Sequence, residues 1–76
     1  MNIDSYNRAI DKLAFYTRMA VLAEKGTPAY TTYIDKLQAG ISILSIAYDK
    51  SFDEVESDAR KAYESKYRCY WEREIG

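Results

Sequence analysis

The stretch that decides the fold covers residues 37–48 and reads LQAGISILSIAY, twelve residues without a charged side chain. Apolar or aromatic residues recur before and within it at alternating spacings of four and three, at positions 30, 34, 37, 41, 44 and 48. This spacing predicts a helix with a seam that faces one partner. Ala39, Ile43 and Ile46 fall on a different side of the same helix. Because so much of its circumference is apolar, we expect either two neighbours in the chain or a second copy of the chain to cover it.

A membrane span explains the same stretch less well. A bilayer requires roughly 20 consecutive apolar residues, whereas this stretch has twelve and is flanked by Asp35-Lys36 and Asp49-Lys50. Gly40 lies on its packing face. Glycine destabilises a helix interior by about 1 kcal/mol relative to alanine, so either another backbone approaches Gly40 closely or the glycine is merely tolerated.

The whole chain, residues 1–76, is expected to form a single all-α domain. We predict an antiparallel three-helix bundle with helices at about 3–25, 28–48 and 51–74, because short connections make successive helices antiparallel neighbours. Gly26 is expected just past the end of the first helix. Thr27-Pro28 suits an N-cap followed by proline, and Ser51 with Glu54 forms a capping-box pattern. Whether the third helix packs on its own chain or on another copy stays open.

Apolar residues in the other two helices follow the same pattern. The main stripe of the first helix comprises Ile3, Tyr6, Ile10, Leu13, Thr17, Ala20 and Val21, and Phe15, Met19 and Leu22 form another patch on its far side. The inward stripe of the third helix comprises Phe52, Val55, Ala59, Ala62, Tyr63, Cys69 and Tyr70. The second patch indicates that the first helix also has more than one partner.

Chain length points to self-association. A chain of this size buries only about 60% of its unfolded surface, and small domains commonly gain stability from disulfides, metals or oligomers. The single Cys69 excludes an intrachain disulfide framework, and without any histidine a zinc site lacks its usual ligands. The bundle is therefore expected to be completed by homo-oligomerisation.

Composition narrows the class of protein further. With 11 basic and 12 acidic residues the net charge is −1, which argues against a DNA- or RNA-binding protein. The lone cysteine and the lack of a signal-like N-terminus favour a cytoplasmic location. A chain that is 47% hydrophobic is typical of a globular protein, and its eight tyrosines are unusual.

Catalysis is not expected. Without histidine a general base would have to be a carboxylate or a lysine, and Cys69 has no histidine partner to activate it. The carboxylate pairs Asp53/Glu54 and Glu72/Glu74 stand near helix ends, where solvation and the helix dipole account for them. No glycine-rich phosphate loop is present, and no cofactor or metal is predicted.

Ligand binding is the more productive hypothesis, and eight residues are candidates for it. Tyrosine rings stack on nucleobases and are enriched in binding hot spots, while lysine and arginine pair with phosphates. One group, expected near one end of the bundle, is Tyr6, Arg18, Lys25 and Thr27; the alternative group, on the third helix, is Lys66, Tyr67, Arg68 and Trp71. The structural alternatives are core packing for the tyrosines, extension of Arg18 and Lys66 to solvent, and helix capping for Thr27.

The pattern L-Q-x-G-x-x-x-L-x-x-A is made by Leu37, Gln38, Gly40, Leu44 and Ala47. It resembles the second helix of the phage anti-CBASS cyclic-nucleotide sponges, whose helical-hairpin domain also occurs in a phage anti-Thoeris sponge. The resemblance implies a compact homo-oligomer that sequesters a cyclic nucleotide between protomers without hydrolysing it. In that family a tyrosine and a lysine fifteen residues apart on the first helix contact the ligand. The residue fifteen before Lys25 is Ile10, so no ligand residue is carried over by position.

Two functions are therefore expected. The first is a non-enzymatic, phage-type anti-defence protein that binds and sequesters a cyclic nucleotide as a homo-oligomer, in the host cytoplasm if it is phage-encoded. The alternative is a protein-interaction module, such as an inhibitor or immunity protein, that docks the aromatic face of residues 63–71 onto a larger host protein. The same tyrosine-rich cluster serves both, so the sequence does not separate them.

Overall fold

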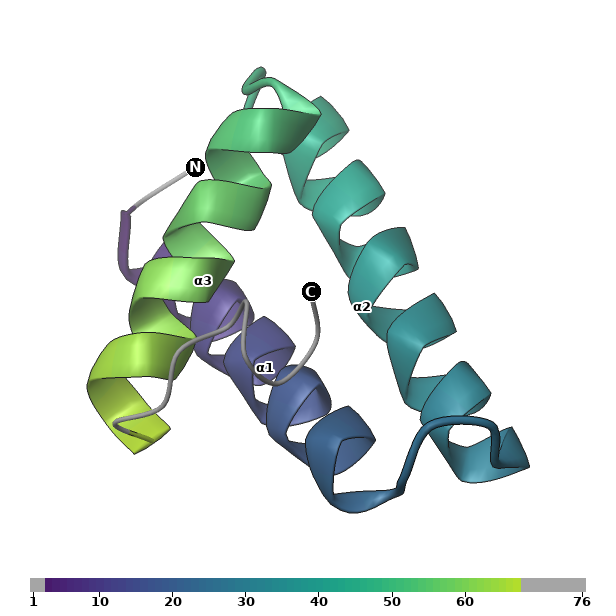
Figure 1. Cartoon of the computed structure of the whole chain (residues 1–76). Coiled ribbons are helices and arrows are strands. Elements are labelled where there is room, and N and C mark those ends of the chain that lie inside the picture. The colour runs from purple at the N-terminus through teal and green to yellow at the C-terminus, as the bar shows by residue number, and fades with distance from the viewer. Residues whose placement is uncertain (1–2, 68–76) are drawn as a thin grey trace.

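The computed structural model describes residues 3–67, which form α1 (Ile3–Leu22), α2 (Pro28–Ala47) and α3 (Phe52–Tyr67). In Figure 1, α2 and α3 diverge from the turn that joins them, and α1 passes behind α3 toward the start of α2. Each pair of helices is in contact, and no strand occurs in this part of the chain. The predicted all-α three-helix bundle is confirmed, and α3 packs on its own chain.

The first connection differs from the prediction. α1 ends at Leu22 rather than near Lys25, and the first residue with a left-handed backbone is Glu24 (φ 63°), not Gly26 (φ 89°). Thr27 explains the early end. Its Oγ1 lies 2.6 Å from the Ala23 carbonyl oxygen and 2.8 Å from that of Glu24, and it accepts a hydrogen bond from the Tyr30 N–H at 3.2 Å. One hydroxyl therefore satisfies backbone groups at both the end of α1 and the start of α2.

The α2–α3 connection largely follows its predicted capping chemistry. Ser51 Oγ accepts from the Glu54 N–H at 3.1 Å and lies 3.4 Å from Glu54 Oε1, so the serine half of the capping box forms. Asp49 takes a left-handed backbone (φ 53°). Ser45 Oγ donates to the Lys50 carbonyl at 2.5 Å, which fixes the turn against the last turn of α2.

The core lies where α1 meets the other two helices. Its buried residues are Tyr6, Ile10, Leu13, Ala14, Leu37, Ile41, Leu44, Val55, Ala59 and Tyr63. A Cβ at Gly40 would overlap Cδ2 of Leu13 on α1, so the end of that side chain would have to shift. The close approach expected at Gly40 is thus to a side chain and not to a backbone. Thr17 is also fully buried, and its hydroxyl donates to the Leu13 carbonyl at 3.0 Å.

Several apolar residues expected to be covered are exposed. Ile3 and Phe52, each the first residue of its helix, are 72% and 41% exposed because the bundle ends beside them. On the outer side of α2, Ile43 and Ile46 are 65% and 83% exposed. Phe15 and Leu22 on α1 are exposed as well. None of the helices within residues 3–67 is long and apolar enough to cross a membrane.

Candidate functional site

The first predicted group of ligand residues is divided between opposite ends of α1. Tyr6 lies at the end where α2 turns into α3, beside Tyr48 and Asp58. Lys25 and Thr27 lie in the turn after α1, and because a helix rises about 1.5 Å per residue, most of the length of α1 separates them from Tyr6. The expectation that these residues share one end of the bundle is wrong. Thr27 is occupied as the cap of α2, and Lys25 is exposed.

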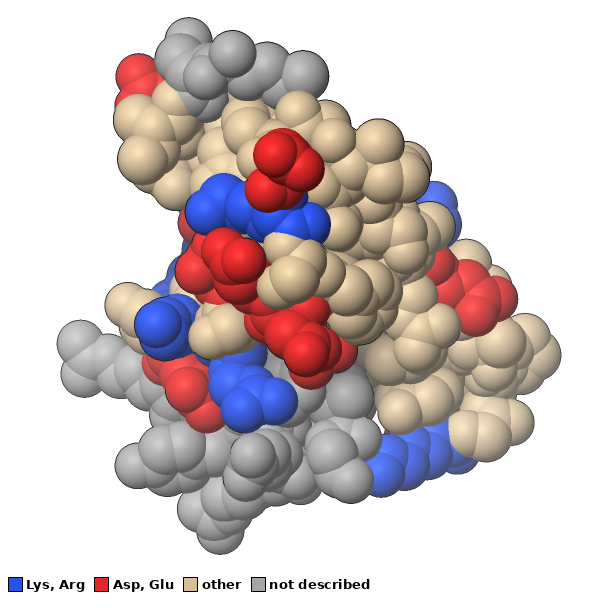
Figure 2. Space-filling model, turned by 90° about the horizontal axis from the view of Figure 1, so that it is seen from above, with Lys and Arg blue, Asp and Glu red and all other residues tan. Residues whose placement is uncertain are grey.

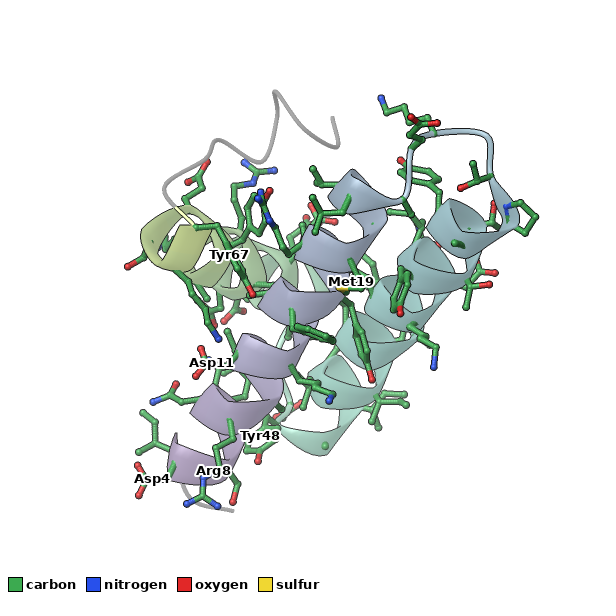
Figure 3. All side chains as sticks on the ribbon, turned by 90° about the horizontal axis from the view of Figure 1, so that it is seen from below. Asp4, Arg8, Asp11, Met19, Tyr48 and Tyr67 are labelled. Atoms are coloured by element: carbon green, nitrogen blue, oxygen red, sulfur yellow. The ribbon has the colours of Figure 1, made fainter. Side chains whose placement is uncertain are left out.

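The structure instead brings Arg18 of the first group to Tyr67 of the second. The Arg18 Cζ lies 5.4 Å from the centre of the Tyr67 ring, and Lys66 Nζ lies 5.8 Å from it. Figure 3 shows Tyr67 on the side of α1 that α3 occupies. Arg68 and Trp71 lie outside the described residues.

Tyr63 is fully buried in the core, 5.3 Å from the Tyr67 ring centre. It therefore cannot belong to an exposed aromatic face on α3. The protein-docking surface that the sequence suggested for residues 63–71 therefore loses its first residue.

A groove lies between α1 and α3 in the described part of the chain, and residues of the α2–α3 connection also line it. It has a volume of about 540 Å³. Its apolar and aromatic lining consists of the buried Tyr6 and Ile10, the half-buried Tyr48 and Ala62, and the exposed Ile3. Its rim carries two acidic and two basic side chains, Asp11, Asp58, Lys50 and Lys61. We call it the Tyr6 groove. An apolar hollow with a few converging polar groups is the usual form of a small-molecule site.

Tyr6 lies at the centre of this groove and is held by three contacts. Its hydroxyl donates to Asp58 Oδ2 at 2.5 Å. The Tyr48 ring meets the Tyr6 ring edge to face, with centres 4.9 Å apart and planes at 66°. Lys50 Nζ lies 4.9 Å from the Tyr6 ring centre. Residues of α3 and of the α2–α3 connection therefore fix its position.

The protonation state of Tyr6 follows from these surroundings. Burial raises the pKa of the phenol well above its usual value of 10, and the hydrogen bond to Asp58 and the negative charges of Asp58 and Glu54 raise it further. Tyr6 consequently stays protonated at neutral pH, and its hydroxyl is a hydrogen-bond donor. A phenol with this pKa is poorly suited to act as a base or nucleophile.

A second hollow of about 350 Å³ adjoins the groove over the first turns of α3. It shares Lys50, Asp58 and Lys61 with the groove and adds Asp53 and Glu54. In Figure 2, charged side chains of both signs gather over α3, whereas much of the remaining visible surface is uncharged. Within residues 3–67, no group of three or more histidine, cysteine, aspartate or glutamate side chains is arranged to hold a metal ion.

Of the groove residues, only Tyr6 was among the predicted ligand residues. No sequence motif marks Lys50, Asp58 and Lys61 as part of a site. The acidic residues in the first turns of α3 are explained by the helix dipole. The fold alone brings them beside Tyr6. The sequence also gave no sign of a cation–aromatic cluster between α1 and α2. There, Lys12 Nζ lies 5.7 Å and Lys36 Nζ 5.8 Å from the Tyr16 ring centre, and the Tyr33 ring centre lies 6.3 Å from it.

Comparison with known proteins adds no relative: no protein-family model, no curated protein and no solved structure matches this chain.

Proposed function

We propose that this protein is a non-enzymatic binding protein that holds a nucleotide, in particular a cyclic nucleotide, in the Tyr6 groove. The observation that carries the proposal is that aromatic and apolar side chains line the same groove as two lysines, Lys50 and Lys61. Nucleotides combine a flat, stacking base with a phosphate, and these two surfaces suit the two parts. The volume of about 540 Å³ is within the range of small-molecule sites.

Each part of a nucleotide has a matching group in the groove. Lys50 and Lys61 offer ammonium donors to a phosphate. The half-buried Tyr48 ring and the exposed Ile3 side chain offer apolar surface to a base. Asp11, which projects from α1 on the side of α3 in Figure 3, offers a carboxylate that accepts from a ribose hydroxyl or a base amino group.

Sequestration, without turnover, is the favoured outcome of binding. The groove's central phenol remains protonated, and the rim carboxylate Asp58 already accepts its hydrogen bond. Sequestration is also what the resemblance of residues 37–47 to the anti-CBASS sponges implies. A role as a phage-type anti-defence protein in the host cytoplasm belongs to this proposal.

The test is native mass spectrometry and calorimetry of the full chain with a panel of cyclic mono-, di- and trinucleotides. Binding of a fixed number of nucleotides is expected, and Lys61→Ala is expected to weaken it about tenfold, because a hydrogen bond to a charged group contributes about 1.5–3 kcal/mol. Lys66→Ala is the matched control, since Lys66 is also an exposed α3 lysine but does not line the groove.

Two results would contradict the proposal in different ways. Uptake of no nucleotide in the panel would remove the function itself. Loss of affinity in Lys66→Ala with none in Lys61→Ala would keep the function but place the ligand beside Arg18 and Tyr67 instead of in the groove.

A further inference from the structure

The outer side of α2 is an apolar strip that no described residue covers. Ile43 and Ile46 are 65% and 83% exposed, and Ala39 and Ala47 on the same helix are exposed too. Ala39, Ile43 and Ile46 follow one another at spacings of four and three, so they form one stripe along the helix. We call these three residues the α2 outer stripe. An exposed stripe of large apolar side chains is typical of a surface that another protein covers.

The charged residues at the two ends of the stripe indicate which protein covers it. Asp35-Lys36 precedes the uncharged stretch and Asp49-Lys50 follows it, with acid before base at both ends. Lys36 and Asp49 are equally distant along the sequence from the midpoint between Ser42 and Ile43. If a second copy of α2 lies antiparallel about that midpoint, Lys36 of each chain lies near the level of Asp49 of the other, which follows the last residue of α2 by two positions. A parallel copy in register would instead place like charges together, which is unfavourable.

The same antiparallel register also matches side chains by size. Ala39 and Ile46 are equally distant from the midpoint, so Ile46 of each chain faces Ala39 of the other. A large side chain opposite a small one allows two helices to interdigitate closely. Charge and size therefore favour the same arrangement.

We propose that the α2 outer stripe is a two-fold symmetric interface on which a second copy of this chain packs, with its α2 antiparallel to the first. A two-fold interface uses the same surface on both subunits, and a helix whose charges match its own reversed copy satisfies that requirement. The interface does not use the Tyr6 groove, so it does not depend on the function proposed for that groove.

The first test is sedimentation velocity of the full chain over a concentration series that reaches the high micromolar range. A reversible dimer is expected, and Ile46→Glu is expected to raise its dissociation constant at least about tenfold, because dimerisation would bury an unpaired carboxylate. Leu22→Glu is the matched control, since Leu22 is 61% exposed but lies on α1 and outside the Tyr6 groove. A monomer at every concentration, or equal weakening by both variants, would overturn the proposal.

The second test determines whether the two α2 helices are antiparallel by exchanging two charges. Lys36→Asp and Asp49→Lys each place like charges together in the antiparallel dimer and are expected to weaken it. The double variant Lys36→Asp/Asp49→Lys restores opposite charges and is expected to recover the affinity. This pair is chosen because neither Lys36 nor Asp49 lines the Tyr6 groove, whereas Lys50 does. Circular dichroism verifies that each variant is folded, and a double variant as weak as the single ones would rule out this register.

Discussion

α1 and α2 are both helices of 20 residues, yet they are buried to very different extents. Six residues of α1 are buried, from Tyr6 to Ala20, whereas α2 buries only Leu37, Ile41 and Leu44. α2 is nevertheless the more apolar of the two in sequence, since it contains residues 37–47 of the uncharged stretch. α1 lies against both other helices, and α2 presents its second apolar side to the outside. Apolar content therefore indicates how much surface a helix can bury, while the topology decides how much is buried within the chain.

A pair of substitutions on the two sides of α2 tests this difference in burial most directly. Ile41 is 1% exposed and Ile46 is 83% exposed. Ile41→Ala is expected to lower the free energy of unfolding by about 2–5 kcal/mol, because it removes buried methyl groups and leaves a cavity. Ile46→Ala is expected to change it by less than about 0.5 kcal/mol in the monomer.

Urea denaturation of both variants at low protein concentration, where any dimer is dissociated, measures the difference. Similar losses in the two variants would mean that the outer side of α2 is covered within the monomer. The burial contrast between the two sides of α2 would then not hold.

A smaller effect is expected at the turn that joins the two helices. Thr27 Oγ1 accepts from the Tyr30 N–H and lies within hydrogen-bond distance of two carbonyls at the end of α1. Thr27→Ala is expected to cost about 1–2 kcal/mol, the upper part of the range for an N-cap, because it leaves groups of both helices without a partner. Ser51→Ala, which removes the exposed cap of α3, serves as the comparison and is expected to cost about 1 kcal/mol or less. A larger loss in Ser51→Ala would show that the shared turn is not the stronger cap.

The sequence predicted the elements of this fold better than their surroundings. The three helices could be predicted because their signals act within about one helical turn. These signals are the alternating apolar spacings, Thr27-Pro28 and Ser51. The prediction placed the end of α1 too late because the hydroxyl of Thr27, the N-cap of the next helix, bonds to the carbonyls of Ala23 and Glu24. Likewise, Tyr6 was recognised as a binding candidate, but Asp58 and Lys61 lie more than fifty residues away in sequence. Only the packing of α3 on α1 brings them together, and no local pattern encodes that.

Gly40 is the point at which the packing of α1 on α2 can be changed by a single methyl group. Alanine gains about 1 kcal/mol over glycine inside a helix, but a Cβ here overlaps the end of the Leu13 side chain, which is buried. Overpacking of a core typically costs about 1–3 kcal/mol. The net expectation for Gly40→Ala is a loss of about 1 kcal/mol.

A double-mutant cycle with Leu13→Ala separates the two contributions to the Gly40 effect. In that background the methyl group has room, so Gly40→Ala is expected to become neutral or stabilising in thermal or urea denaturation. If Gly40→Ala stabilises the protein with Leu13 intact, the contact between the two helices is looser than the structure indicates.

The smallest effect is the contribution of Tyr6 to the pH dependence of the free energy of unfolding. Tyr6 lies near the N-terminal end of α1 and connects this helix to α3 through Asp58. Its folded-state pKa lies above the unfolded value of about 10, so the folded protein retains this proton longer than the unfolded chain as the pH rises. The associated stability is fully present below pH 10 and decreases as the pH rises above it. Tyr6→Phe lacks this titration. The free energy of unfolding of the parent protein is therefore expected to fall more steeply between pH 9 and 11 than that of the variant, measured by urea denaturation at each pH. Parallel curves would show that the Tyr6 phenol is no more difficult to ionise in the bundle than in the unfolded chain, and that its hydrogen bond to Asp58 does not link α1 to α3.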